Sequence, residues 1–142
     1  MRVLACVGAS MIHLLLLFWQ TYRERATAMI QALAHPKWQG LLTTQTAIHG
    51  GGGYYLWSQL GDRVQCSAKE VDHMARRTFG VGVKEGSVFA CPGGGAGAEG
   101  EGIKRCMRLC VAFYETEELL EGLDRLHHAL QALAKQPERS RL

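Results

Sequence analysis

Apolar residues recur with a helical period toward the end of the chain. They are Leu119, Leu123, Leu126, Leu130 and Leu133, spaced by four, three, four and three residues. This spacing places them on one face of an α-helix. Three glutamates stand at the start of this stretch, where the positive end of the helix dipole favours negative side chains. The pattern predicts a long C-terminal helix that begins near Thr116.

A second apolar stripe runs through the N-terminal part of the chain. It consists of Leu15, Trp19, Tyr22, Ala26, Met29 and Leu33, again at alternating spacings of four and three residues. The His35-Pro36 step ends the pattern, because proline disfavours helical backbone in the residue before it. We therefore predict an amphipathic helix over residues 13–35 and leave residues 1–12 unassigned. A leader or a short membrane span is the alternative for residues 3–19, whose only polar side chains are Ser10 and His13.

The middle of the chain alternates between β-forming residues and glycine. Residues 41–48 and 54–60 are rich in β-formers on either side of a glycine run at residues 50–53, which predicts two strands. Residues 81–83 and 105–113 are predicted as two further strands. Between these two strands, the Gly/Ala/Glu segment at residues 93–102 is predicted to be a mobile loop.

A short helix is expected between the second and third strands. Ser67 and Glu70 have the spacing of a capping box, in which each side chain accepts a hydrogen bond from the other residue's backbone amide. Gly80 stands where a left-handed residue commonly ends a helix. The resulting order of elements predicts an α+β fold, an α/β sandwich with a small mixed sheet covered by helices and with long helices at both ends.

Composition narrows the functional classes. The chain has 142 residues, of which 47% are hydrophobic and 20% charged, as expected for one globular domain. Its net charge of +3 comes from scattered residues, so no nucleic-acid partner is indicated. The five cysteines include no CxxC pair, which predicts free thiols and no zinc or other metal site.

Two glycine motifs suggest chemistry that the remaining sequence does not support. Residues 49–52 match the HGGG oxyanion-hole element of esterases, but no GxSxG nucleophile elbow accompanies them. Residues 95–100 fit GxGxxG, but they follow no predicted strand closely and carry Glu99 where a pyrophosphate would approach. We interpret both motifs as loop sequence and identify no catalytic residue.

Arg108 is the candidate binding residue. It lies in an otherwise apolar predicted strand, where a guanidinium needs an anionic partner or a route to solvent because an unpaired buried charge is costly. One interpretation is a structural ion pair with a helix glutamate. The other is a two-point contact with a substrate carboxylate, which suits the planar guanidinium group.

Four segments resemble, in order and spacing, the C-terminal part of class I/II pyridoxal-phosphate-dependent aminotransferases of fold type I. They are residues 22–25, 51–57, 82–89 and 108–113, and a Glu-Glu-Leu-Leu-Glu-Gly-Leu helix follows them. The resemblance covers about residues 13–134 and implies the small domain, which closes over the substrate. It also implies that Arg108 binds the substrate α-carboxylate, and that Gly52, Gly53 and Tyr54 lie on the strand approaching the active site.

The same resemblance implies pyridoxal 5'-phosphate as the cofactor. In that family the Schiff-base lysine and the phosphate-binding segment lie in the large domain, and no lysine of this chain stands in an SxxK-like setting. We therefore expect a C-terminal fragment of an enzyme that transfers amino groups between an amino acid and a 2-oxo acid, inactive and without cofactor on its own. A large domain or a second copy of the chain is the expected partner. The alternatives are a non-catalytic interaction module that docks on a full-length relative, and a membrane-anchored remnant.

The expected location follows from the cysteines and the last residues. An odd number of thiols suits a reducing compartment, which predicts the cytoplasm. Residues 135–142 form a basic tail that ends in Ser140, Arg141 and Leu142, one conservative step from the Ser-Lys-Leu peroxisomal address. The peroxisome is therefore the alternative location.

Overall fold

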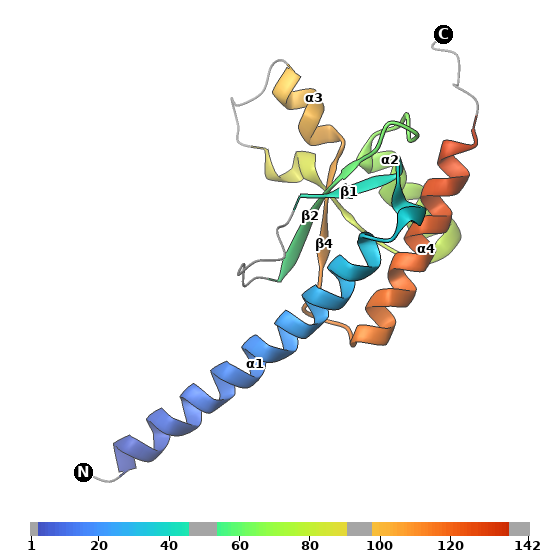
Figure 1. Cartoon of the computed structure of the whole chain (residues 1–142). Helices are drawn as coiled ribbons and strands as arrows, with labels where there is room; N and C mark the ends of the chain where they lie inside the picture. The colour runs from blue at the N-terminus through green and yellow to red at the C-terminus, as the bar shows by residue number, and fades with distance from the viewer. Residues whose placement is uncertain (1–2, 46–53, 91–97, 137–142) are drawn as a thin grey trace.

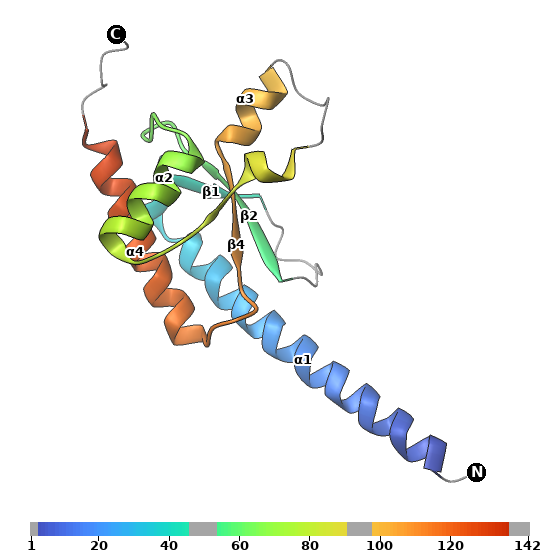
Figure 2. The ribbon, with the colours of Figure 1, turned by 180° about the vertical axis from the view of Figure 1, so that it is seen from behind.

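The computed structural model describes residues 3–45, 54–90 and 98–136, in which a small sheet lies between two unequal layers of helix (Figure 1). The helices are α1 (Val3–Leu33), α2 (Ala68–Met74), α3 (Ala98–Lys104) and α4 (Thr116–Ala134), and the strands are β1 (Leu42–Thr44), β2 (Tyr55–Leu60), β3 (Lys84–Glu85) and β4 (Cys106–Cys110). Helices α1, α2 and α4 cover one face, whereas α3 and the 3-10 helix η3 (Gly86–Phe89) lie on the other side (Figure 2). The predicted α+β class with long helices at both ends is confirmed.

The sheet has the strand order β1-β2-β4-β3, and its three strand pairs are antiparallel rather than mixed as expected. Successive side chains of a strand point to opposite faces, and Leu56, Ser58 and Leu109 accordingly lie on the buried face with the core. Tyr55, paired in register with Cys110, lies on the opposite face. The helices therefore bury one face of the sheet and leave much of the other accessible.

Helix α1 begins at Val3, so it includes most of the segment that the sequence left unassigned. Its C-terminal part packs on α4 and β1, with Met29 and Leu33 in the core. Its N-terminal part projects from the body as a single rod (Figures 1 and 2). Eight large apolar side chains there are 46 to 63% exposed: Met11, Ile12, Leu14, Leu15, Leu16, Leu17, Phe18 and Trp19. No helix within the described residues combines the length and apolarity needed to cross a membrane.

A buried arginine fixes α1 to the end of the sheet. Arg25 donates hydrogen bonds to the Ala112 carbonyl oxygen at 3.1 Å and to the Glu115 carboxylate at 2.6 Å. Glu115 precedes the first residue of α4, so one side chain joins α1, the segment after β4 and the start of α4. Strand β4 ends at Cys110, before the predicted end at residue 113, and the chain beyond it is bonded to Arg25 through the Ala112 carbonyl oxygen.

The capping box predicted for α2 is confirmed. The Ser67 amide donates to the Glu70 carboxylate at 2.8 Å, and the Glu70 amide donates to the Ser67 hydroxyl at 3.3 Å. After α2 the chain widens into the π-helical turn η2 (Ala75–Phe79), which ends at Gly80 with a left-handed φ of +67°. The sequence therefore predicted both ends of this helical segment.

The predictions for the middle of the chain were partly wrong. The third strand occupies Lys84–Glu85 rather than residues 81–83, because Asp72 accepts a hydrogen bond from the Val83 amide at 2.8 Å and holds it away from β4. Residues 98–104 are helical rather than part of a loop, and Lys104 pairs there with Glu101 at 2.6 Å. Of the predicted strand at 41–48, β1 forms residues 42–44, and residues 46–48 lie outside the described residues.

Candidate functional site

Arg108 lies in the middle of β4 on the face that the helices leave accessible. Its Cζ atom lies 3.8 Å from the centroid of the Tyr55 ring and 4.4 Å from the centroid of the Phe89 ring. A guanidinium is attracted to the faces of aromatic rings at such distances. Within the described residues no carboxylate forms an ion pair with Arg108, and the α4 glutamate Glu121 pairs with Arg125. The structural ion pair considered for Arg108 is therefore not formed there.

The neighbours of Arg108 across the sheet are another aromatic residue and another cation. Trp57 is its partner on β2, and Lys84 is its partner on β3. Side chains at paired positions of adjacent strands lie side by side on one face, and the Trp57 ring also contacts the Phe89 ring with centroids 6.0 Å apart. This face combines two positive charges with three aromatic rings, a combination that attracts organic anions.

Tyr54, predicted to approach the active site, lies directly before β2. Its ring contacts the Tyr22 ring of α1 edge to face with centroids 4.7 Å apart, and the Val111 amide donates to its carbonyl oxygen at 2.9 Å. It does not contact Arg108; the adjacent Tyr55 does. The predicted Gly52 and Gly53, and the tripeptide Ser140, Arg141 and Leu142, lie outside the described residues.

The sequence did not predict the aromatic neighbours of Arg108 as site residues. Tyr55 and Phe89 both fall within segments that carried the family resemblance, residues 51–57 and 82–89. The available signal was period-two alternation, because Arg108 and Tyr55 lie on strands whose other face is apolar. Phe89 follows β3 in a 3-10 turn, and no sequence period predicts its position.

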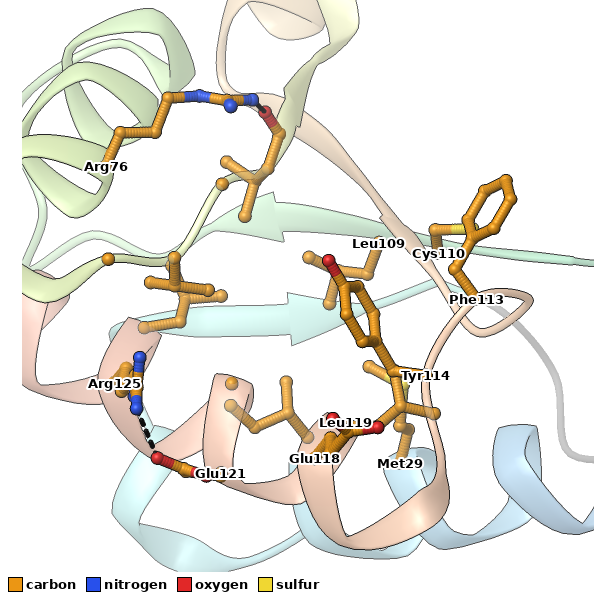
Figure 3. Close-up of a pocket in the computed structure, with 17 residues that line it drawn as sticks. Met29, Arg76, Leu109, Cys110, Phe113, Tyr114, Glu118, Leu119, Glu121 and Arg125 are labelled. Carbon is orange, nitrogen blue, oxygen red and sulfur yellow. Dashed lines mark hydrogen bonds and ion pairs between the residues drawn. The ribbon is translucent and has the colours of Figure 1, made fainter.

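A cavity of about 470 Å³ lies elsewhere, where α4 meets residues 80–83 and the end of β4 (Figure 3). Arg76 and Arg125 stand on either side of residues 80–83, and Phe113 points away from the cavity (Figure 3). Both arginines already have acidic partners, because Arg76 pairs with Asp72 and Arg125 with Glu121. Arg108 does not line this cavity. The cavity is therefore separate from the candidate site around Arg108.

Gly122 lines this cavity from within α4 and supplies a test of its packing. A Cβ atom at Gly122 would lie 3.9 Å from the Val81 side chain, an ordinary van der Waals contact. Because alanine is favoured over glycine in helix interiors by about 1 kcal/mol, we expect Gly122→Ala to raise the free energy of unfolding by ~0.5–1 kcal/mol. Urea denaturation followed by circular dichroism measures the change. A loss of stability would show that the cavity beside Gly122 has no room for a methyl group.

Three lysines of the described residues lie at paired or exposed positions. Lys37 pairs with Asp124 at 2.5 Å and Lys104 with Glu101 at 2.6 Å, while Lys84 beside Arg108 is exposed on a two-residue edge strand. A lysine that reacts with a carbonyl group is normally desolvated or placed beside another cation in a built pocket. Among the described residues, no group of three histidine, cysteine or acidic side chains could hold a metal ion.

Cysteine chemistry is not evident at the site either. Cys66, Cys106 and Cys110 are free thiols. Burial raises the pKa of the Cys66 thiol to about 11, and a protonated thiol is a poor nucleophile. Cys106 and Cys110 both lie on the Arg108 face of β4, because side chains two residues apart on a strand share a face. Cys110 pairs there with Tyr55, and the buried Cys106 pairs with Gln59.

The comparisons with known proteins agree with this architecture. No protein-family model and no curated protein matches the chain. Among solved structures, the chain is similar to LysN, the α-aminoadipate aminotransferase of Thermus thermophilus, with 29% identity, a TM-score of 0.60 and coverage of 80% of this chain and 25% of that one. A probable N-succinyldiaminopimelate aminotransferase of the same organism matches at 27% identity with a TM-score of 0.56, covering 78% and 24%.

The fold is shared more widely than these two proteins. A kynurenine aminotransferase of Pyrococcus horikoshii has a TM-score of 0.62 at 22% identity, over 82% of this chain and 25% of that one. LysN was solved with N-(5'-phosphopyridoxyl)-L-leucine and the kynurenine aminotransferase with PMP. The resemblance of this chain to the small domain of pyridoxal-phosphate-dependent aminotransferases is thereby confirmed. The chain spans about a quarter of the length of the structures it matches.

Proposed function

We propose that this chain supplies the small domain of a pyridoxal-phosphate-dependent aminotransferase, in which Arg108 binds the carboxylate of the amino acid or 2-oxo acid substrate. The observation that carries the proposal is the setting of Arg108. It lies half-buried on the accessible face of the sheet, against the Tyr55 and Phe89 rings, with no acidic partner among the described residues. Its N–H donors are therefore available for a carboxylate.

The cofactor of such an enzyme would be held outside this chain. When bound, pyridoxal 5'-phosphate supplies the electron sink for amino transfer, and we place its lysine and phosphate contacts on a large domain. This chain would fix the position and orientation of the substrate through Arg108, and the rings of Tyr55, Trp57 and Phe89 would limit the access of water to that carboxylate. Alone, the chain would bind no cofactor and transfer no amino group.

The test is a titration of the isolated chain with pyruvate, the smallest 2-oxo acid, followed by the NMR signals of Arg108. We expect these signals to shift in the wild type, and Arg108→Lys to weaken binding by about tenfold, because an ammonium group cannot make the two-point contact of a guanidinium. Arg23→Lys is the control, since Arg23 lies on α1 against Trp19. Equal binding by the Arg108→Lys variant would contradict the proposal. Unfolding of an Arg108→Ala variant would instead identify a structural role.

A second candidate is a non-catalytic module that docks on a full-length relative. The exposed apolar side chains of α1 between Met11 and Trp19 support it, because large apolar patches mark sites of protein association. For this function, replacing Leu15 and Phe18 by lysine would abolish binding to the relative, whereas Arg108→Lys would leave that binding unchanged. The two candidates are thus separated by which substitution has an effect.

We place the protein in the cytoplasm, with the peroxisome as the alternative if Ser140, Arg141 and Leu142 serve as an address. The free thiols of Cys66 and Cys106 support a reducing compartment. A reporter fused before Met1 distinguishes the two locations. A punctate signal that becomes diffuse on deletion of Leu142 would favour the peroxisome.

A further inference from the structure

The two rings against Arg108 come from opposite flanks of its strand. In the strand order β1-β2-β4-β3, β4 lies between β2 and β3. Tyr55 belongs to β2 on one flank, and Phe89 ends η3, which directly follows β3 on the other. The guanidinium Cζ lies 3.8 Å and 4.4 Å from the two ring centroids. The arginine is therefore held from both sides by elements that are distant in sequence.

Ring contacts of this kind leave the hydrogen-bonding capacity of the guanidinium intact. An arginine side chain has five N–H donors, all in the plane of the group. Aromatic faces attract the cation electrostatically and accept none of these hydrogen bonds in the conventional sense. No described hydrogen bond or ion pair uses the Arg108 side chain. An oxygen ligand that approaches its edge thus meets donors that have no competing partner in the described residues.

We propose that Tyr55 and Phe89 are positioning residues that hold the Arg108 guanidinium in a fixed orientation for two-point binding of a carboxylate. This inference rests on the proposed function. A free arginine side chain loses rotamer freedom when it binds a ligand, and prior restriction removes part of that cost. The half-exposed rings, 46% for Tyr55 and 40% for Phe89, remain accessible beside the ligand, and the Trp57 ring supports Phe89 from the side.

The experiment compares pyruvate binding and the Arg108 spectrum in ring variants of the full chain. We expect Tyr55→Leu and Phe89→Leu each to weaken pyruvate binding about fivefold and to reduce the ring-current shift of the Arg108 Nε–H signal, since each variant retains one of the two rings. Tyr55→Phe keeps the ring and is expected to restore both. Phe113→Leu is the matched control, because Phe113 is an exposed aromatic residue and the described rings in contact with Arg108 are those of Tyr55 and Phe89. Dispersed amide spectra confirm that each variant is folded.

The outcomes separate the inference from the proposed function. If Tyr55→Leu and Phe89→Leu bind pyruvate as tightly as the wild type while Arg108→Lys does not, the positioning role is overturned and Arg108 remains the carboxylate ligand. If pyruvate shifts the wild-type Arg108 signal no more than sodium chloride does at equal ionic strength, the positioning role and the proposed carboxylate binding by Arg108 are both overturned. A loss of binding in the Phe113→Leu control, equal to that of Tyr55→Leu, also contradicts the positioning role, because it shows that removing an aromatic side chain away from Arg108 has the same effect.

Discussion

Replacing Gly61 by alanine is expected to lower the free energy of unfolding by at least ~3 kcal/mol, the range in which overpacking against an immobile neighbour becomes severe. A Cβ atom at Gly61 would lie less than 3.0 Å from the Gly40 carbonyl group and 2.9 Å from the Leu41 amide nitrogen. All of these atoms belong to the backbone, so no side chain can rotate away. The Gly61 amide also donates to the Leu41 carbonyl oxygen at 2.9 Å, and relieving the clash would break this hydrogen bond.

Urea denaturation of the Gly61→Ala variant measures this loss, and Gly122→Ala provides a matched control. The two variants carry the same chemical change, but the nearest neighbour of a Cβ atom lies 3.9 Å away at Gly122. We expect opposite signs for the two effects. A Gly61→Ala variant with wild-type stability would show that the segments around Gly40 and Gly61 move apart at little cost, contrary to the packing described above.

Trp38→Ala is expected to cost ~3–5 kcal/mol, as is usual when a buried aromatic side chain is removed. The Trp38 side chain is 2% exposed, its Nε1–H donates to the Ala32 carbonyl oxygen at 2.9 Å, and its ring contacts the His127 ring edge to face. It thus joins the end of α1 to the middle of α4. Its removal leaves a cavity in the core and takes away the shorter of the two hydrogen bonds that the Ala32 carbonyl oxygen accepts, the other coming from the His35 amide at 3.3 Å.

The control for this prediction is Trp19→Ala. Trp19 lies on the projecting part of α1 with half of its surface exposed, and substitutions at such positions usually change stability by less than about 0.5 kcal/mol. Thermal unfolding of both variants distinguishes the loss of a tryptophan packed in the core from the loss of an exposed tryptophan. Equal losses would show that the N-terminal part of α1 is packed against a partner, because an exposed side chain on a free helix contributes little.

Some features of this protein were determined by local sequence alone. The leucines from Leu119 to Leu133 fixed the last helix, since a stripe at spacings of three and four residues can be buried only on one face of a helix. The Ser67–Glu70 capping box and the left-handed Gly80 delimited the second helical segment through contacts within a few residues. The start of α1 was not predicted, because residues 3–12 are apolar on all sides and carry no periodicity.

The surroundings of Arg108 depended on the tertiary structure. The sequence singled out this arginine because a charge in an apolar strand requires an explanation. It could not supply the neighbours, since Tyr55 and Phe89 flank Arg108 only after β2 and β3 have paired with opposite edges of β4. Strand order and register arise from the summed burial of residues far apart in the chain. The identity of the candidate residue is therefore a property of the sequence, and its aromatic setting is a property of the fold.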